Sequence, residues 1–443
     1  MDRQIEYVLR TVEERGVRLI RLWFTDVLGQ LKSFAISPAE LETAFDEGMT
    51  FDGSAIDGFS RIQESDVLAV PDPASFEMLP WVTSEPTARM FCDIRRPNSD
   101  AFAGDARNVL RRNLDRAGEL GYSFFVAPEM EYFLLASGDP GQPIRPLDTA
   151  GYFDLTTADV ASDIRRKTIS VLEAMGVPVE YSFHEDAPSQ HEIDLRYTDA
   201  LTMADNVMTF RLVVREIAME AGVYATFMPK PVAGVQGSGM HTHLSLFHDG
   251  SNAFHDPDRE TGMSVVAEQF VAGLLHHARE ITAVTNQLIN SYRRLIRGYE
   301  APTAISWARN NRSALVRVPT LKPHKPDSAR VEYRAPDPAA NPYLCYSVIL
   351  AAGLKGIEGG YELDAEAETD LFQLSPSDLA ARRIQRLPET LAEALDVMEG
   401  SDLVRETLGE HIFEWFLINK RAEWAEFRQQ VTPFEIDRYL PAV

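Results

Sequence analysis

Two histidines and a serine stand at alternate positions in the stretch from Gln236 to Phe247, QGSGMHTHLSLF. The residues after the glycines favour a β-strand, and side chains two positions apart in a strand share a face. His241, His243 and Ser245 would then lie together, opposite an apolar face. Such a row of polar groups indicates a strand that lines a polar cavity, and the preceding glycines would let a ligand approach the backbone closely.

Carboxylates repeat this alternate spacing in other segments. They are Glu129 and Glu131 in PEMEYFLL, Glu192 and Asp194 before Arg196 in HEIDLR, Glu332 before Arg334 in VEYR, and Glu185 in the short loop that leads to Glu192. Any one such pair is more typical of a solvated strand face. Five glutamates and a histidine that converge on one cavity would repel one another unless a cation lay between them. Mg²⁺ or Mn²⁺ suits these ligands, so the strands together predict a shared metal site.

An island of positive charge lies between these strands. From Tyr292 to Arg334 there are ten Lys and Arg against three Asp and Glu, although the whole chain has a formal charge of −24. One interpretation is a solvated basic face. The position of the island between carboxylate strands favours the other, which is a site for an anionic substrate with several phosphates.

The composition limits the classes of function. The 443 residues are 45% hydrophobic, which is enough for a sizeable core and for two or three domains. The acidic charge argues against nucleic acid or an anionic membrane as a partner. The chain starts with an amphipathic pattern and contains no run of about eighteen apolar residues, so we expect a cytoplasmic protein. Cys92 and Cys345 have apolar neighbours, which favours buried thiols over a disulfide.

Long helices alternate with the strands that must position these groups. We expect helices over residues 2–15, 105–119, 158–175, 200–221, 264–286 and 342–356, a hairpin of strands 17–25 and 31–36, and a domain boundary near residues 97–104. Strands with one polar face differ from the apolar strands of a parallel sheet, so the predicted fold class is α+β. Neither GxxxxGK[ST] nor GxGxxG after a strand occurs, so a nucleotide would have to bind in another way.

Seven segments, in order and over almost the whole length, give the chain its resemblance to the type I glutamine synthetases. They are FDGS at 51, PEMEYF at 128, HEDAPSQHEID at 184, GSGMHTHLS at 237, GYEAP at 298, NRSALVRVP at 311 and RVEYRAPDPAANPYL at 330. The resemblance implies a small N-terminal β-grasp domain, residues 1–103. It also implies a C-terminal catalytic domain, residues 104–443, whose antiparallel strands, flanked by helices, form a funnel for ATP and glutamate. Active sites would form between neighbouring subunits of a dodecamer of two stacked six-membered rings.

The resemblance also implies roles for individual residues. Two or more Mg²⁺ or Mn²⁺ ions per active site would be held, one by Glu131, Glu185 and Glu192, another by Glu129, His241 and Glu332. His243 and Ser245 would lie beside the nucleotide, Arg317 and Arg330 on its phosphates, and Arg312 at the transferred phosphoryl group. Glutamate would be bound by Gln236, Gly237, Arg294 and Arg334. The amine pocket would be shaped by Tyr152, by Glu300 on a flap, and by Asp52 of the neighbouring subunit, which would accept the ammonium proton.

Four positions depart from the family pattern. Ala55 replaces the second serine of DGSS, Phe183 the first of two histidines, Gln236 an asparagine, and Arg297 a frequent proline. None removes a metal ligand or the proposed base. The departures therefore predict that phosphoryl transfer is intact while the amine pocket has changed.

We expect an ATP-dependent ligase that forms glutamine from glutamate and ammonia through γ-glutamyl phosphate. The alternative is a ligase that makes γ-glutamyl amides from a polyamine, ethanolamine or methylamine, because a lost hydroxyl and added apolar surface suit an alkyl amine. A third interpretation is a regulator or scaffold of this fold without catalytic activity. The complete set of metal ligands argues against it. Phe372, in the loop DLFQL where some bacterial members carry an adenylylated tyrosine, has no hydroxyl, so we expect no such control.

Overall fold

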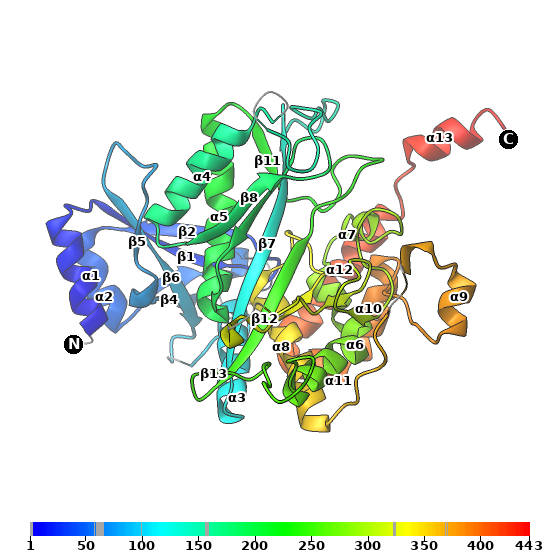
Figure 1. Cartoon of the computed structure of the whole chain (residues 1–443). Coiled ribbons are helices and arrows are strands. Elements are labelled where there is room, and N and C mark those ends of the chain that lie inside the picture. The colour runs from blue at the N-terminus through cyan, green and yellow to red at the C-terminus, as the bar shows by residue number, and fades with distance from the viewer. Residues whose placement is uncertain are drawn as a thin grey trace.

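Two β-sheets covered by helices organise the chain in the computed structural model (Figure 1). The structure describes residues 3–56, 58, 66–98, 100–155, 159–321, 325–367, 369 and 371–443, and only the backbone of residues 55 and 376. The predicted α+β class is confirmed, since nearly all strand pairs are antiparallel and the long helices lie outside the sheets.

The elements run as follows. The helices are α1 (Arg3–Glu14), α2 (Leu41–Asp46), α3 (Ala106–Glu119), α4 (Ser162–Ala174), α5 (Ala200–Glu220), α6 (Val265–Thr285), α7 (Ser291–Arg294), α8 (Pro342–Gly359), α9 (Pro376–Ala381), α10 (Leu391–Glu399), α11 (Asp402–Leu408), α12 (Glu410–Phe427) and α13 (Pro433–Tyr439). The strands are β1 (Leu19–Thr25), β2 (Leu31–Ile36), β3 (Met49–Asp52), β4 (Asp66–Pro71), β5 (Glu77–Met78), β6 (Thr87–Arg95), β7 (Ser123–Leu135), β8 (Val179–His184), β9 (Gln190–Leu195), β10 (Thr198–Asp199), β11 (Tyr224–Thr226), β12 (Met240–His248), β13 (Ser251–Asn252), β14 (Trp307–Ala308), β15 (Val316–Arg317) and β16 (Val331–Tyr333).

The first sheet has the strand order β2-β1-β6-β4-β3, with β5 paired to β6. The predicted hairpin joins β1 to β2, and its turn is closed by Asp26, whose carboxylate accepts the Gln30 N–H at 2.8 Å. Gly29 occupies the turn with a φ of +83°, a conformation that favours glycine. Buried apolar residues of this sheet pack against α1, which makes a core separate from that of the second sheet.

The second sheet has the order β14-β15-β16-β12-β7-β9-β8, with short strands β10 and β11 on β7 and β13 on β12. Its register aligns the polar residues across strands. Glu129 lies opposite His241, Glu131 opposite Glu192, and Glu332 opposite His243. Because side chains alternate along each strand, this register gathers them on one face, while Met130, Met240 and other apolar residues pack on the opposite face.

Buried charges join the two sheets. Arg107 of α3 donates to Asp72 at 2.7 Å and to Asp205 of α5 at 2.9 Å, and it also pairs with Asp93 of β6. A buried guanidinium needs such compensation, so this cluster ties the N-terminal sheet to the helices of the second sheet.

The ends of some elements differ from the prediction. Pro38 begins a 3₁₀ turn (Pro38–Glu40), and α2 follows it. Helix α8 continues past Gly356 to Gly359 and ends because Gly360 adopts the left-handed conformation. A Cβ at Gly356 would lie 2.1 Å from the Gln269 carbonyl oxygen, so Gly356 permits close packing of α8 on α6 and does not end the helix.

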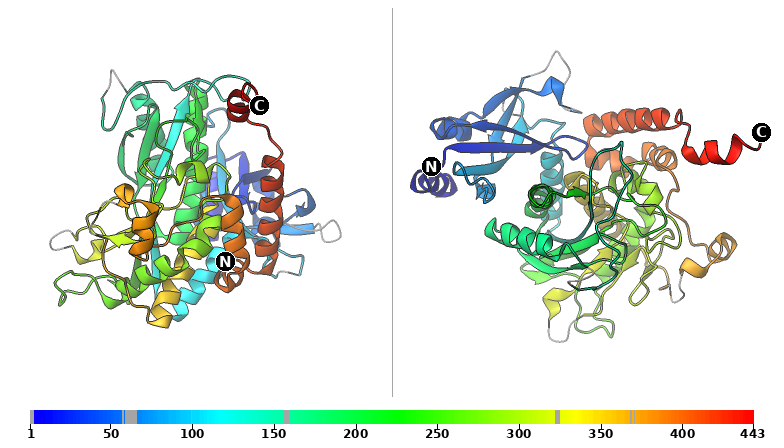
Figure 2. Two further views of the ribbon diagram at one scale, coloured as in Figure 1. Left: turned by 90° about the vertical axis from the view of Figure 1, so that its right-hand side faces the viewer. Right: turned by 90° about the horizontal axis from the view of Figure 1, so that it is seen from above.

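The C-terminal arm leaves the body of the molecule. Figure 1 and Figure 2 show α13 extending away from the other helices. Its apolar residues Phe434, Ile436 and Leu440 are exposed. In the described part of the chain, no helix combines the length and apolarity that crossing a bilayer requires.

Candidate active site

The aligned polar faces of β7, β9, β12 and β16 enclose a central cavity of about 200 Å³. Most of the residues predicted for the site line it: Glu129, Glu131, Tyr152, Glu185, Glu192, Gln236, Gly237, His241, Arg294, Glu300, Arg312, Arg317, Glu332 and Arg334. A neighbouring cavity of about 330 Å³ is lined by His243, Ser245 and Arg330. The cavities share Glu129, Asp194 and Arg317. Asp52 lines neither cavity.

One group of possible metal ligands centres on Glu129. One ligand atom each of Glu129, His241 and Glu332 lies within 4.8 Å of the others. Burial would raise the pKa of Glu129, but His243 and His241, which are hydrogen-bonded to it at 2.7 and 3.0 Å, bring that pKa well below its usual value. Burial, followed by the charge of Arg334, lowers the pKa of His241 to about 4. The imidazole is therefore neutral, the form that binds a metal.

A second group of carboxyls, Glu131, Glu185 and Glu192, lines the same cavity. Burial, with the charge of Glu185 next, raises the pKa of Glu131 well above its usual value. Burial and the charge of Glu131 do the same to Glu192, and burial raises the pKa of Glu185. Buried carboxyls that raise one another's pKa are favourable only as protonated groups or with cations between them. A donor set of carboxylate oxygens and one imidazole fits Mg²⁺ or Mn²⁺.

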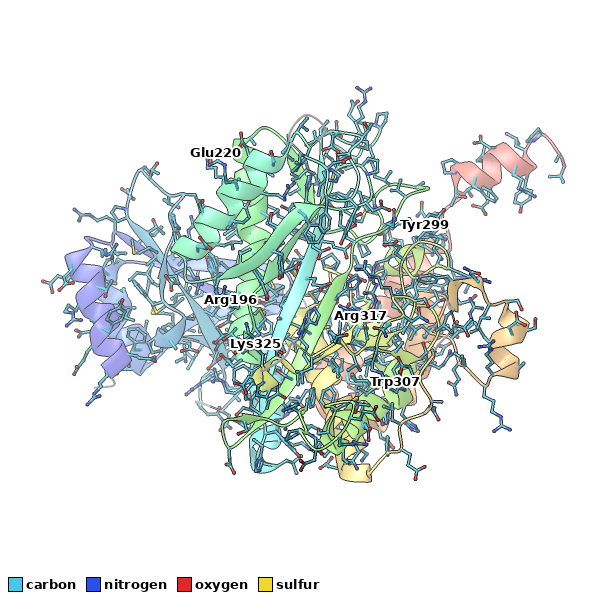
Figure 3. All side chains as sticks on the ribbon, viewed as in Figure 1. Arg196, Glu220, Tyr299, Trp307, Arg317 and Lys325 are labelled. Carbon is cyan, nitrogen blue, oxygen red and sulfur yellow. The ribbon has the colours of Figure 1, made fainter. Side chains whose placement is uncertain are left out.

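Arginines face this carboxyl cluster. Arg334 donates to Glu332 at 2.8 Å, and Arg317 pairs with the other oxygen of Glu332. Arg294 is buried and donates to the carbonyls of Ala335 and Arg334 at 2.7 and 3.1 Å. Figure 3 labels Arg317 near the middle of the sheet, beside β12.

The basic island divides between the cavities and the surface. Arg294, Arg312, Arg317, Arg330 and Arg334 line the two cavities, as predicted for an anionic substrate. Three other cations of the island contact protein groups instead: Arg293, Arg297 and Arg309. Arg309, for example, pairs with Glu366.

The glycines before β12 lie close to other groups of the protein. A Cβ at Gly237 would lie 2.3 Å from the Pro229 carbonyl oxygen, and one at Gly239 would lie 2.6 Å from a guanidinium nitrogen of Arg294. The close approach is therefore made by the protein's own groups. Gly237 still lines the cavity.

The second cavity carries the residues predicted for the nucleotide. Arg330 donates its Nε–H to His243 Nδ1 at 3.3 Å, and His243 Nε2 donates to Glu129 at 2.7 Å. Ser245 lies two residues after His243 on β12 and is buried. This chain of contacts links the second cavity to the carboxyl cluster.

Aromatic side chains form the wall near Tyr152. Tyr152 and Phe153 lie with ring centroids 4.0 Å apart, and each contacts Phe183. Burial, followed by the charge of Glu185, raises the pKa of Tyr152. Phe183 thus lines the cavity at one of the positions that depart from the family pattern, whereas the side chain of Ala55 lies outside the described residues.

Two predicted residues have partners of their own outside the carboxyl cluster. Gln236 donates to Asp186. Asp52, on β3, accepts the backbone N–H of Ser54 at 2.8 Å, and hydrogen bonds from Ser54 lower the pKa of Asp52.

Glu300 lies in the loop after α7 with a φ of +56°, a strained conformation for a non-glycine residue.

Besides Phe183, four cavity residues were not among the predicted site residues. Gln190 donates to Glu131 at 2.9 Å, and Asp194 has its pKa raised to about 7 by burial and by the charge of Glu129. Both lie at alternate positions with Glu192; the strand pattern placed Asp194 on that face and could have identified Gln190 in the same way. Tyr299 and Phe372 also line the cavity, but each comes from a loop with no local signal.

A buried network supports the loop that carries Glu185. His184 contacts the Glu185 carbonyl through Nδ1 at 2.6 Å and Asp148 through Nε2 at 3.1 Å. Both partners are acceptors, so both ring nitrogens donate and the ring is charged. Burial would lower the pKa of His184, but these hydrogen bonds raise it. Arg165 donates to His191 Nδ1 at 2.8 Å, which fixes the proton of that ring on Nε2.

Comparison with known families agrees with this geometry. Residues 16–97 match the glutamine synthetase β-grasp domain, and residues 103–439 match the glutamine synthetase catalytic domain. The chain belongs to the glutamine synthetase family. The first sheet is accordingly the β-grasp domain that was expected, and the chain is a carbon–nitrogen ligase of the glutamine synthetase type.

Members of the family from several organisms are similar over the full length. The chain is 56% identical to glutamine synthetase of Mycolicibacterium smegmatis, with 99% of this chain and 100% of that protein covered. It is 57% identical to glutamine synthetase of Mycobacterium tuberculosis, with the same coverage.

Solved structures of the family share the fold. GmaS in complex with ADP has a TM-score of 0.88 at 32% identity, with 98% of this chain and 99% of that chain covered. Plasmodium falciparum glutamine synthetase has a TM-score of 0.90 at 22% identity, with 99% of both chains covered, which shows the fold alone.

Proposed function

We propose that this chain makes glutamine from glutamate and ammonia with the use of ATP, through γ-glutamyl phosphate. The observation that carries the proposal is the joined pair of cavities, one lined by carboxyls and arginines and the other by the residues expected beside a nucleotide. Full-length relatives at 56 and 57% identity, both glutamine synthetases, support it.

The carboxyl cluster would hold two divalent ions. Glu129, His241 and Glu332 would bind one, and Glu131, Glu185 and Glu192 the other. When bound, Mg²⁺ or Mn²⁺ neutralises the charge that spreads over a transferred phosphoryl group. Asp194, with a pKa of about 7, borders both cavities and would accept a hydrogen bond near these ions once it is ionised.

The arginines would position and neutralise the substrates. A γ-carboxylate of glutamate is a poor electrophile, so one of its oxygens first attacks the terminal phosphorus of ATP and ADP leaves. Arg317 and Arg330 would bind the phosphates and Arg312 the moving phosphoryl group, beside His243 and Ser245. Glutamate would be held by Gln236, Gly237, Arg294 and Arg334.

The amide bond then forms at the acyl carbon. Ammonium must lose a proton before its nitrogen can attack, and phosphate leaves as the carbon–nitrogen bond forms. Asp52 would take this proton, while Tyr152 and Glu300 would complete the pocket. The loop that carries Glu300 would keep water away from the acyl phosphate.

The proposed role of Asp52 requires a homo-oligomer, because Asp52 lines neither cavity of its own chain. We propose that the Asp52 carboxylate enters the cavity of a neighbouring subunit in a dodecamer of two stacked six-membered rings. The exposed apolar side chains of α13 support an assembly of this kind, because such surface is normally covered by a partner. We also propose a domain boundary between residues 103 and 104. The cytoplasmic location remains a prediction.

A second candidate reaction uses an organic amine in place of ammonia. It is favoured by one observation, the aromatic cluster of Tyr152, Phe153 and Phe183 at the edge of the cavity. Such rings offer apolar surface to an alkyl chain and a π-face to an ammonium group.

Phosphate release with ATP, Mg²⁺ and glutamate tests both candidates. Ammonium, methylamine, ethanolamine, putrescine and spermine are compared at equal concentration, and glutamine is measured directly. A preference for ammonium with stoichiometric glutamine supports the proposal. Preference for an organic amine with little glutamine overturns it in favour of the second candidate.

The Asp52→Ala variant tests the proposed base. We expect it to bind ATP like the wild type and to lose amide formation, because Asp52 is the residue proposed to accept the proton that ammonium loses. Turnover equal to that of the wild type would refute the role of Asp52.

A further inference from the structure

The side chain of Lys230 is buried beneath the loop that follows α7. Lys230 is 8% exposed, and its Nζ is buried without a hydrogen-bond partner among the described residues. That Nζ lies 3.7 Å from the centroid of the Tyr299 ring. An ammonium group removed from water without compensation is strongly unfavourable, so the π-face of Tyr299 is the interaction that offsets its burial.

The backbone of Lys230 is rigidly held. Its N–H donates to Asn290 Oδ1 at 2.7 Å, and Asn290 Nδ2 donates back to the Lys230 carbonyl at 3.1 Å. Asn290 directly precedes α7. The backbone of Lys230 is therefore fixed, and its side chain reaches the loop from this position.

The loop itself has few other anchors. Ile296, Arg297, Gly298 and Glu300 are exposed, and Tyr299 is half-buried. Arg297 donates to the Phe372 carbonyl, and Gly298 and Glu300 have positive φ values. A loop with such strain and so little burial depends on individual contacts for its position.

We propose that Lys230 is a positioning residue that holds Tyr299, and with it Glu300, over the central cavity through this cation–π contact. Tyr299 and Glu300 both line that cavity, so the position of the ring fixes the position of the neighbouring carboxylate. No hydrogen bond or ion pair of the Lys230 side chain competes with the contact among the described residues.

The contact is also coupled to the proposed glutamate site, a step that rests on the proposed function. Burial, followed by the positive charge of Arg294, lowers the pKa of Lys230. A glutamate carboxylate bound by Arg294 would offset that repulsion and strengthen the contact with Tyr299. Substrate binding would in this way favour the closed loop before the amine enters.

Tryptic cleavage after Arg297 measures loop opening independently of activity. We expect Lys230→Met to accelerate this cleavage about tenfold, which corresponds to about 1.4 kcal/mol. Lys230 precedes Pro231, so the substitution removes no bond that trypsin readily cleaves. Lys230→Arg should stay close to the wild type, because a guanidinium also binds an aromatic face. Lys167→Met, at an exposed lysine paired with Glu220, is the control and should change nothing.

A double-mutant cycle separates the contact from a general structural effect. Tyr299→Leu should accelerate cleavage as Lys230→Met does, and the double variant should be no faster than either single one. Equal cleavage of Lys230→Met and wild type, or fully additive effects, would overturn the proposal. If Lys230→Met unfolds and is cleaved at all sites, the comparison of Tyr299→Leu with Tyr299→Phe decides instead. Faster cleavage after Arg297 in Tyr299→Leu than in Tyr299→Phe supports the contact, and equal cleavage overturns the proposal.

The ratio of phosphate released to glutamine formed tests the consequence for chemistry. A loop that opens more often admits water, so the ratio of phosphate to glutamine should rise severalfold in Lys230→Met. In Lys230→Arg it should stay close to the wild-type value. Protection of Arg297 by glutamate should be weaker in Lys230→Met than in the wild type. If the wild type makes no glutamine, the proposed function fails, but the cleavage rates without substrate still decide whether Lys230 holds the loop.

Discussion

Removal of divalent metal should leave protons on the carboxyl cluster near neutral pH. Burial and neighbouring carboxylates raise the pKa values of Glu131 and Glu192 well above the usual range, and that of Asp194 to about 7. Asp194 is therefore largely protonated at pH 6.5 when a chelator removes the metal, and Glu131 and Glu192 keep their protons to higher pH than ordinary glutamates do. Metal binding requires the ligands Glu131 and Glu192 ionised, and a cation nearby favours the ionised form of Asp194, so binding must release protons.

The magnitude follows from the shift of Asp194. Its pKa rises from 3.8 to about 7, which at 1.36 kcal/mol per unit is at most about 4 kcal/mol. The folded state binds this proton more tightly than the unfolded state. The stability contributed by this group is therefore fully present below about pH 4 and is lost as the pH rises through 7 in the metal-free protein.

Calorimetric titration with Mg²⁺ in two buffers of different ionisation enthalpy counts the protons. We expect protons to be released at pH 6.5, from Glu131, Glu192 and Asp194 together. The Asp194→Asn variant should release about one fewer. Thermal unfolding of the chelator-treated protein should also lose stability between pH 5 and 7, and saturating Mg²⁺ should remove most of that loss.

Equal binding heats in the two buffers would refute this reasoning. They would mean that the carboxyls are already ionised without metal, and that the repulsion argued from their burial is absent. Metal-free stability that rises with pH over the same range would contradict the sign.

Three further predictions concern other parts of the chain. Arg107→Ala should lower the free energy of unfolding by about 3–5 kcal/mol in denaturant titrations, since it removes the buried guanidinium that pairs with the buried Asp205 and with the half-buried Asp72 and Asp93; a loss below about 1 kcal/mol would contradict this. Asp148→Asn should weaken Mn²⁺ binding, measured by electron paramagnetic resonance, roughly 10- to 100-fold, because His184 would no longer fix Glu185; unchanged affinity would exclude that role. Mass spectrometry of the native protein should find no adenylyl group on any tyrosine, because Phe372 has no hydroxyl.

The strand-borne part of the site could be predicted from the sequence. Alternation along a strand has a fixed period, so it gives the residues of one face without knowledge of the fold. That rule placed Glu129 and Glu131 together, and His241 with His243. The pattern cannot supply the register between strands, which sets Glu129 opposite His241 and depends on the whole sheet.

Contacts between distant loops could not be predicted from local patterns. Phe372 reaches the cavity from far along the chain, and the contact of Lys230 with Tyr299 joins loops that neither periodicity nor turn chemistry relates. Nothing in the sequence indicates that the Pro229 carbonyl oxygen lies close to Gly237. Helix ends depended on single residues such as Gly360.

The shared wall of the two cavities limits where phosphoryl transfer can take place. Glu129, Asp194 and Arg317 border both cavities, and Glu129 is hydrogen-bonded to His243 on one side and to His241 on the other. If the nucleotide enters one cavity and glutamate the other, the terminal phosphate and the γ-carboxylate can meet only at this wall. Glu129, which would hold one ion with His241 and Glu332, belongs to this wall, whereas Glu185 and Glu192, which would hold the other with Glu131, lie near Tyr152. Substitution of Glu129 should therefore impair phosphoryl transfer itself, while substitution of Glu185 should chiefly impair the binding of glutamate and the amine step.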